Sequence, residues 1–344
     1  MTHHLNRLAR LLAFVAAAWA LAGCMNGEPE LAVHTLSGTT MGTTYSVKVV
    51  ASQDLDLRAT RQQVQAVLDR INQRMSTYRD DSELSRFNRA EANQWFAVSD
   101  ETARVVALGL TISEQTQGAF DMTVGPLVNL WGFGPNGVIS KAPSQQQIDE
   151  LRGRIGYQSI SVRSEPPALL KTADQYLDLS AIAKGYAVDA VADLLAPEFS
   201  AYLVEVGGEL RAHGIKPDGQ PWRIAVESPL AGTRGDVQEV IRASETAIAT
   251  SGDYRNYFEQ DGVRYSHTID PATAKPITHR LASVTVLDPS CARADALATA
   301  MMVLGDERGR RLAEAMDLAV LFIVKTDEGF AEYATEAFKP FLIQ

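Results

Sequence analysis

The sequence predicts an α+β fold, with mixed or antiparallel sheets and flanking helices, and two observations lead to this prediction. Many short segments have the apolar pattern of strands, yet few alternate regularly with helices as a doubly wound parallel sheet would require. The composition also suits a packed core, because 46% of the 344 residues are hydrophobic and 22% are charged. No linker is evident after the first segment, so we expect one catalytic unit over residues 35–344.

Residues 1–23 are predicted to be a secretory signal peptide. A basic start precedes the uncharged apolar run of residues 11–22, which is shorter than a membrane-spanning helix. The segment ends in Leu21-Ala22-Gly23-Cys24, which resembles the bacterial lipobox. We therefore expect cleavage before Cys24, lipidation of this cysteine, and a tether over residues 24–34 that holds the protein on a membrane surface. The alternative is a secreted protein in which the cysteine is coincidental.

The charge and the cysteines exclude two further classes. The formal net charge of −10 disfavours binding to nucleic acid, because a polyanion would meet a surface of like charge. Cys24 and Cys291 are the only cysteines of the chain. If Cys24 is acylated, Cys291 has no partner within the chain, so the fold does not depend on an internal disulfide.

The first half of the domain is predicted to be mainly helical after an opening strand. Alternation of apolar and polar residues indicates the strand, apolar residues at helical spacing indicate the helices, and Ser99 and Ser144 are the expected N-caps. In order, we expect a flexible entry at residues 38–42, a strand at 43–50, a helix at 64–75, a charged loop through Asp81 and Glu83, a helix from residue 100 to before Gly118, and a short helix at 145–151.

A glycine pattern in this half matches a known motif by letter only. Gly132, Gly134 and Gly137 fit G-x-G-x-x-G, the fingerprint of dinucleotide-binding folds. However, no β-branched strand precedes the motif, Pro135 lies inside it, and no amphipathic helix follows. We interpret the segment as a glycine-rich loop.

The second half is predicted to be mainly strands. Paired glycines at Gly207-Gly208 indicate a sharp bend or a close approach of the backbone to another group. We expect strands at residues 201–206, 222–227, 247–252, 265–271, 282–287, 318–324 and 331–335, and a helix at residues 292–304.

Residues 176–186 are expected to form a strand, a turn at Asp178 and the start of a helix. Backbone N–H groups and the positive end of the helix dipole at such a junction favour an anion such as phosphate. Lys184 would reach the same anion. The alternative is an ordinary connection in which Asp178 is a cap and Lys184 faces solvent.

Asp295 and Thr299 form a candidate cation site. They are four residues apart and share one helix face, where their oxygens suit a hard cation such as Mg²⁺. The alternative gives both residues a role within their own helix. His267 is either a satisfied core residue or a catalyst, and we disfavour a Cys–His nucleophile with Cys291, because nothing near the cysteine supplies an oxyanion site.

Seven short motifs, in order from about residue 35 to residue 304, resemble those of the FAD:protein FMN transferases, the ApbE-type lipoproteins of bacteria. Each motif is weak alone, but the ordered set is specific. The motifs are Gly38-Thr39-Thr40-Met41-Gly42-Thr43, Met75-Ser76-Thr77-Tyr78, Gly118-Ala119-Phe120-Asp121, Asp178-Leu179 through Lys184-Gly185-Tyr186, Val206-Gly207-Gly208, Ser266-His267-Thr268-Ile269-Asp270-Pro271 and Ala294-Asp295-Ala296-Leu297-Ala298-Thr299.

The resemblance implies an enzyme that attaches FMN from FAD to a threonine of a partner protein through a phosphoester bond and releases AMP. Mg²⁺ would be held against the FAD diphosphate by the Ala181 carbonyl, Asp295 and Thr299, and His267 is the candidate base. The residues implied to contact FAD are Met41, Tyr78, Ala119, Phe120, Asp121, Asp178, Lys184 and Ile269.

The resemblance also implies partners and a location. The acceptors in the family are flavin-carrying subunits of membrane redox complexes of the Nqr type (sodium-pumping NADH:quinone reductase) and the Rnf type. The protein would act on the periplasmic side of a bacterial membrane, and the residue after Cys24, which is not Asp, favours the outer membrane. The alternative functions are an FAD-binding lipoprotein without chemistry and a Mg²⁺-dependent FAD pyrophosphatase.

Overall fold

The structure is a computed structural model that describes residues 30–343, apart from residues 136–141, 230–236, 254–256 and 261–262. The expected signal peptide and Cys24 lie outside the described residues. The first strand begins at Leu31, within the segment expected to be a tether. In the described part of the chain, no helix combines the length and the apolar character needed to cross a membrane.

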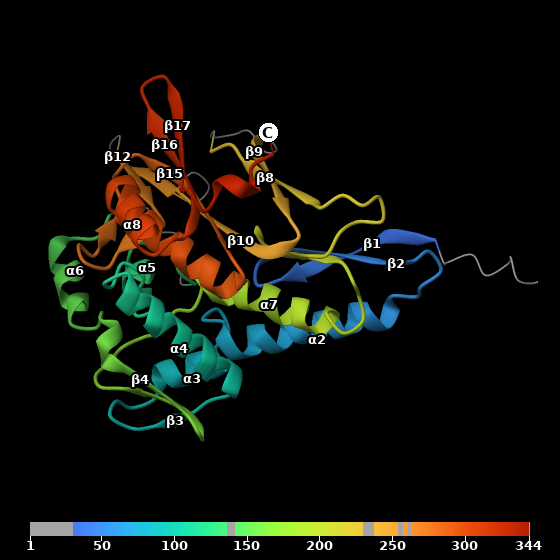
Figure 1. Cartoon of the computed structure of the whole chain (residues 1–344). Coiled ribbons are helices and arrows are strands. Elements are labelled where there is room, and N and C mark those ends of the chain that lie inside the picture. Colours follow the sequence, from blue (N-terminus) through green and yellow to red (C-terminus); the bar gives the residue numbers. More distant parts are fainter. Residues whose placement is uncertain (1–29, 136–141, 230–236, 254–256, 261–262, 344) are drawn as a thin grey trace, which may run out of the picture.

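An antiparallel sheet of eight strands forms the centre of the molecule (Figure 1). Every neighbouring pair in it is antiparallel, which confirms the predicted α+β class. The order across the sheet is β1 (Leu31–Thr40), β2 (Thr43–Ser52), β6 (Tyr202–Val206), β7 (Glu209–His213), β10 (Glu245–Gly252), β15 (Leu281–Asp288), β16 (Ala319–Thr326) and β17 (Gly329–Ala334).

The two faces of the sheet are covered differently, and successive side chains follow this division. Val286 packs with the helices on one face, whereas Leu287 packs on the other face against the two-stranded sheet of β8 (Trp222–Glu227) and β9 (Val237–Ala243). Because neighbouring side chains of a strand point to opposite faces, strands buried on both faces read as continuous apolar runs. In β15 the residues Leu281 to Leu287 are all buried, with the small polar Ser283 and Thr285 among the apolar ones.

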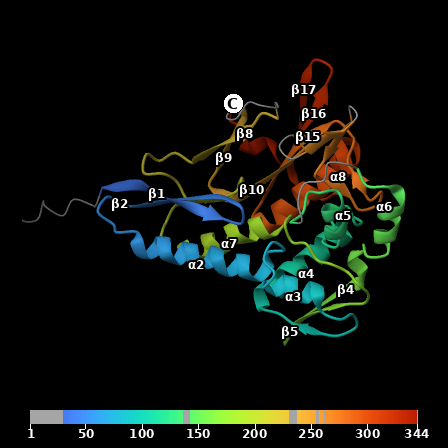
Figure 2. The same cartoon turned by 180° about the vertical axis from the view of Figure 1, so that it is seen from behind.

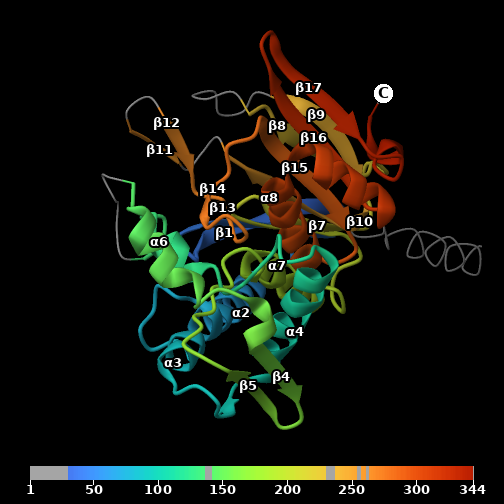
Figure 3. The same ribbon diagram turned by 90° about the vertical axis from the view of Figure 1, so that its left-hand side faces the viewer.

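Helices α7 (Ala183–Leu195) and α8 (Cys291–Ala315) lie directly on the sheet (Figure 3). The helices α2 (Arg58–Met75) and α4 (Asp100–Gln115) pack against α7 and α8, and α2 also contacts the β1–β2 hairpin (Figure 2). The smaller elements are α3 (Glu83–Arg89), α5 (Gly125–Leu130), α6 (Gln145–Arg152), the sheet β3 (Phe96–Ala97), β5 (Pro167–Lys171) and β4 (Ile160–Ser164), and the pairs β11 (Tyr257–Gln260) with β12 (Val263–Ser266) and β13 (Ile269–Asp270) with β14 (Lys275–Pro276).

Two carboxylates join α7 and α8 at their N-termini. Asp189 of α7 accepts hydrogen bonds from the N–H groups of Cys291 and Ala292, both at 3.0 Å, at the start of α8. In the reverse direction, Asp295 of α8 accepts a hydrogen bond of 3.1 Å from the N–H of Gly185 in the first turn of α7. A Cβ atom at Gly185 would lie only 2.3 Å from the carbonyl oxygen of Cys291, so this close approach requires glycine. The reciprocal caps place the start of α7 against the face of α8.

Several predicted elements are confirmed. The strand at residues 222–227 matches β8, and the pair Gly207-Gly208 forms the bend between β6 and β7 with positive φ angles of 62° and 108°. Ser99 and Ser144 cap α4 and α6 as expected. The G-x-G-x-x-G match follows helix α5 and not a strand, which supports its rejection, although Gly137 lies outside the described residues.

Other expectations were wrong. The segment before Asp178 is not a strand, because it pairs with no other strand, whereas the expected turn and helix start are present. Residues 38–40 are the end of β1 and not a flexible entry, and the charged loop ends where α3 begins at Glu83. The helix expected at residues 292–304 continues to Ala315 through a kink at Gly305, whose φ of 76° allows the bend.

Candidate active site

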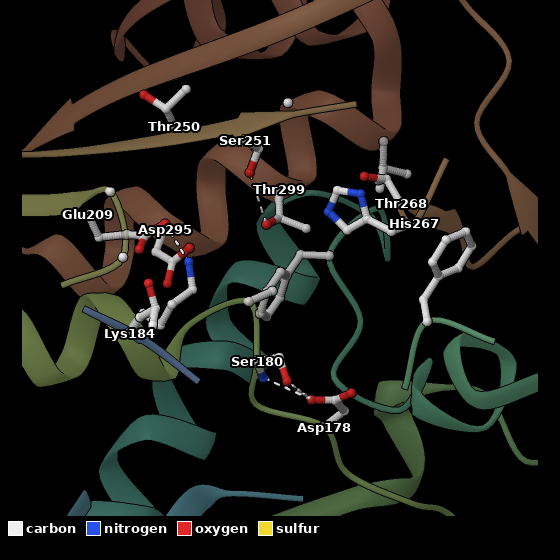
Figure 4. A pocket seen from close by; sticks show the side chains of 18 of the residues that line it. Asp178, Ser180, Lys184, Glu209, Thr250, Ser251, His267, Thr268, Asp295 and Thr299 are labelled. Carbon is white, nitrogen blue, oxygen red and sulfur yellow. Dashed lines mark hydrogen bonds and ion pairs between the residues drawn. The ribbon is translucent and has the colours of Figure 1, made fainter. Parts of the chain in front are cut away.

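A cavity of about 900 Å³ lies where the starts of α7 and α8 meet the β6–β7 bend (Figure 4). Its lining comes from segments spread over most of the domain, which explains why the motifs are short and scattered. The predicted site residues that line it are Tyr78, Ala119, Phe120, Asp121, Asp178, Ala181, Lys184, His267, Ile269, Asp295 and Thr299. Met41 is not among the lining residues; it occupies the β1–β2 turn with a φ of 49° and packs against the main core.

Lys184 lies in the first turn of α7 and forms an ion pair of 2.6 Å with Glu209, the first residue of β7. Burial by itself lowers the pKa of Lys184, but the negative charges of Glu209 and Asp295 outweigh burial and raise it. The charged form of Lys184 is thus favoured at this end of the cavity, and the alternative in which it faces open solvent is wrong, because it pairs with Glu209 and lines the cavity.

Asp295, Thr299 and the backbone carbonyl of Ala181 supply three oxygens of different kinds to the same cavity. Asp295 is 5% exposed, and burial raises the pKa of its carboxyl against the effect of Lys184 and the Gly185 hydrogen bond. The Thr299 hydroxyl lies 3.3 Å from the Ser251 hydroxyl, so it does not serve only its own helix. The Gly185 N–H, four residues after Ala181, donates to Asp295 and not to the Ala181 carbonyl. Among the described residues, no other group donates a hydrogen bond to this carbonyl.

Asp178 is tied to its own turn. Its Oδ1 accepts hydrogen bonds from the N–H of Ser180 at 2.9 Å and from the Ser180 hydroxyl at 2.6 Å, while its N–H donates to the Met122 carbonyl. The turn fixes residues 178–182 just before α7. Tyr78 stands beside it at the mouth of the cavity with 65% of its surface exposed, and partial burial and the charge of Asp178 raise the pKa of its hydroxyl.

Asp121 shapes the loop that carries Ala119 and Phe120. Its Oδ1 accepts from the N–H and the hydroxyl of Thr123, and its Oδ2 accepts from the N–H of Tyr157 at 3.0 Å. Both oxygens are engaged, and burial raises the pKa of the carboxyl. Asp121 therefore acts on the cavity mainly by holding its wall in place.

His267 lies at the bend between β12 and β13, on the side of the cavity away from Lys184 in Figure 4. Its ring is half-buried and meets the edge of Phe133 at a centroid distance of 6.3 Å. It lines the cavity and is thus placed to contact a ligand, whereas Cys291 is fully buried. Burial raises the pKa of the Cys291 thiol well above its usual value, which argues against a cysteine nucleophile.

Sequence reasoning missed Glu209 as a separate site residue, although the motif Val206-Gly207-Gly208 stops directly before it. It also missed the contribution of Thr250 and Ser251 from β10, which line the cavity. The sequence did contain a signal for Glu209. This charged residue directly follows Gly207-Gly208, and paired glycines at the end of a strand indicate a bend at which the backbone approaches another group closely.

Three comparisons with known proteins place this geometry in context. The ApbE family model matches residues 41–322. A protein of Vibrio cholerae named FAD:protein FMN transferase is 51% identical over 325 residues, which cover 94% of this chain and 96% of the relative. Among solved structures, the flavin transferase ApbE of Vibrio cholerae matches with a TM-score of 0.84 at 49% identity and covers 91% of this chain and 100% of its own. The apo form of the Pseudomonas stutzeri flavinyl transferase ApbE matches with a TM-score of 0.84 at 44% identity, covering 92% of this chain and 98% of its own.

Proposed function

Because the chain belongs to the ApbE family and is an FAD:protein FMN transferase, we propose that its cavity binds FAD with the diphosphate between Lys184 and a magnesium ion. The FMN half then passes to a threonine hydroxyl of an acceptor protein, and AMP leaves. The observation that supports this most strongly is the convergence of Lys184, Asp295, Thr299 and Ala181 on one cavity from separate segments of the chain.

The residues present fit a magnesium ion. Mg²⁺ prefers oxygen ligands and is usually held by few protein groups together with substrate phosphates. One carboxylate, one hydroxyl and one backbone carbonyl are such a set, and the Ala181 carbonyl accepts no hydrogen bond from any described residue. When bound, the ion would neutralise charge on the diphosphate. Asp295, Thr299 and Ala181 would hold it, and the Gly185 N–H would keep the Asp295 carboxylate oriented.

Lys184 supplies the positive charge of the protein itself. Its ammonium lies in the first turn of α7, so the partial positive charge of the helix N-terminus adds to it. In phosphoryl transfer, fixed positive groups stabilise the charge that spreads over the transferring and leaving oxygens. We therefore assign Lys184 to the diphosphate.

His267 is our candidate for the base. A threonine hydroxyl is a poor nucleophile until a neighbouring group accepts its proton. Histidine suits this task because its usual pKa lies near neutral pH. Tyr78, Phe120 and Ile269 line the same cavity and offer apolar or aromatic surface to the rings of FAD.

We also propose that the protein is a lipoprotein anchored through Cys24 on the periplasmic side of the membrane, with acceptor subunits of the Nqr or Rnf type. The support is the lipobox-like ending of residues 21–24 and the family resemblance. Acceptors that belong to membrane complexes would lie at the membrane, where a lipid anchor would also hold this enzyme.

The test combines the purified enzyme with FAD, Mg²⁺ and the flavin-carrying domain of a Nqr-type subunit. We expect a fluorescent acceptor with the added mass of FMN and one AMP per label. An acceptor with Thr→Val at the modified position, and a reaction with EDTA, are the controls, and both should remain unlabelled. Equal release of FMN and AMP with and without acceptor would identify a pyrophosphatase instead. Full labelling in EDTA would remove the magnesium ion from the proposal.

A further inference from the structure

Glu209 differs from Asp189 and Asp121, two other buried carboxylates of this domain, in what its oxygens contact. Asp189 and Asp121 both use their two oxygens to hold backbone N–H groups, as structural carboxylates do. Glu209 is only 3% exposed, yet its side chain has one described partner, the Lys184 ammonium, at 2.6 Å. Its second oxygen, Oε2, is buried and accepts no hydrogen bond from any described residue. A buried oxygen left in this way is costly. Asp253, which pairs with Lys325, has such an oxygen as well, but of the two carboxylates only Glu209 lines the cavity.

The β6–β7 bend is shaped around the side chain of Lys184. Gly207 and Gly208 adopt positive φ angles, and Glu205 accepts a hydrogen bond of 2.7 Å from the Gly208 N–H, which fixes the bend. A Cβ atom at Gly207 would lie 3.4 Å from Cδ of Lys184 and 2.9 Å from Thr43. The bend thus lets the lysine stem pass close to the backbone, and the next residue, Glu209, meets the ammonium.

We propose that Glu209 is a positioning residue of the transfer reaction, which acts through Lys184. Its carboxylate holds the ammonium at the edge of the cavity, between the β6–β7 bend and Asp295, before the substrate arrives. Lysine is a flexible side chain, and fixing it in advance removes an entropy cost that would otherwise fall on substrate binding. The inference rests on the proposed role of Lys184 at the FAD diphosphate.

The experiment compares Glu209→Ala, Glu209→Gln, Lys184→Met and the double variant Glu209→Ala/Lys184→Met. We expect Glu209→Ala to lower kcat/KM for FMN transfer by about tenfold and to raise the Kd for FAD, measured by quenching of flavin fluorescence. Glu209→Gln keeps an oxygen for the Lys184 ammonium and should recover transfer to within about threefold of the wild-type rate. The double variant should be no slower than Lys184→Met alone, because Glu209 has nothing left to position.

The matched control is the ion pair of Lys325 with Asp253, which has a distance of 2.7 Å and similar exposure, but lies outside the cavity lining. Asp253→Asn should change the melting temperature without changing kcat/KM or the Kd for FAD. Such a result would show that loss of a similar ion pair elsewhere does not slow the reaction, so that a slower Glu209→Ala reflects the lost positioning of Lys184.

Three outcomes would overturn the inference. The first is a wild-type kcat/KM in Glu209→Ala, and the second is a double variant whose loss of kcat/KM equals the product of the two single losses. The third is a Glu209→Gln variant that is as impaired as Glu209→Ala. The last would indicate that the charge of Glu209, and not its hold on the lysine, is needed. If Lys184→Met itself transfers FMN at the wild-type rate, the proposed phosphate contact fails and the positioning role fails with it. If Lys184→Met is impaired in FMN transfer and Glu209→Ala is not, the proposed function stands and only the role of Glu209 is removed.

Discussion

Replacing Asp295 by Asn separates its two contacts, one to helix α7 and one to the proposed magnesium ion. Asparagine keeps an oxygen that accepts the hydrogen bond from the Gly185 N–H, so we expect the free energy of unfolding to change by no more than about 1 kcal/mol. The variant loses the only carboxylate among the three proposed ligands. We expect FMN transfer to fall by more than about 100-fold, beyond the 10- to 100-fold typical of residues that merely support a metal ligand.

The assay is thermal unfolding with and without Mg²⁺, in the absence of FAD, beside the transfer rate. At about 100 times its Kd, a ligand stabilises the wild-type protein by about 2.7 kcal/mol, and this gain should vanish in Asp295→Asn. The control is Asp189→Asn, which alters the reciprocal cap on α8. It breaks part of the contacts to Cys291, Ala292 and Arg211, and should cost about 2–4 kcal/mol of stability while leaving the response to Mg²⁺ intact.

A rise in melting temperature with Mg²⁺ in Asp295→Asn, equal to that of the wild-type protein, would refute the assignment of Asp295 as a ligand. Loss of the Mg²⁺ response in both variants would show that the contact between α7 and α8 as a whole, and not the Asp295 carboxylate, governs binding of the ion.

Three further predictions follow from the same geometry. Cys291→Ala should transfer FMN at the wild-type rate, because the thiol is buried and its pKa is raised; a loss of rate without a loss of folded protein would contradict this. Tyr78→Ala should raise the Kd for FAD by about tenfold through loss of an aromatic face, with no more than about 0.5 kcal/mol lost in stability, since the side chain is largely exposed. Burial raises the pKa of Glu209 from 4.5 to about 7, so the folded state binds this proton more tightly than the unfolded state. Proton binding at Glu209 therefore contributes up to about 3 kcal/mol to the free energy of unfolding. This contribution is complete below pH 4.5 and is lost as the pH rises to about 7. Denaturation of Glu209→Gln should lack this part of the pH dependence, and identical pH profiles would show that Glu209 titrates normally.

Local sequence signals predicted the elements whose cause is local. Ser99 and Ser144 lie directly before their helices and accept hydrogen bonds from N–H groups three residues on, so a short window contains the whole cap. Residues 282–287, rich in valine and threonine, predicted β15 from a short window in the same way. The strand expected before Asp178 is absent, because an apolar segment becomes a strand only if a partner lies beside it, and pairing depends on the rest of the fold.

The site was predictable as a set of residues but not as a geometry. The ordered motifs contain many of the residues that line the cavity, and all the proposed metal ligands are among them. No spacing in the sequence indicates that the Gly185 N–H donates to Asp295 and leaves the Ala181 carbonyl without a donor among the described residues. Glu209 was missed because its role depends on Lys184, a residue that reaches it only through the packing of α7 on β7.

The strand order also determines at which stage of synthesis and folding the cavity can form. Strand β2 pairs with β6, with Val49 opposite Tyr202, so the sheet joins parts of the chain that a ribosome releases far apart in time. Contacts between such distant segments form slowly, because a long loop must close before they contribute. Lys184 is synthesised well before Asp295 and Thr299, and a nascent chain that stops short of α8 carries half of a site. Any chain cut before that helix is therefore a fragment without catalytic capacity, however well its first strands have paired.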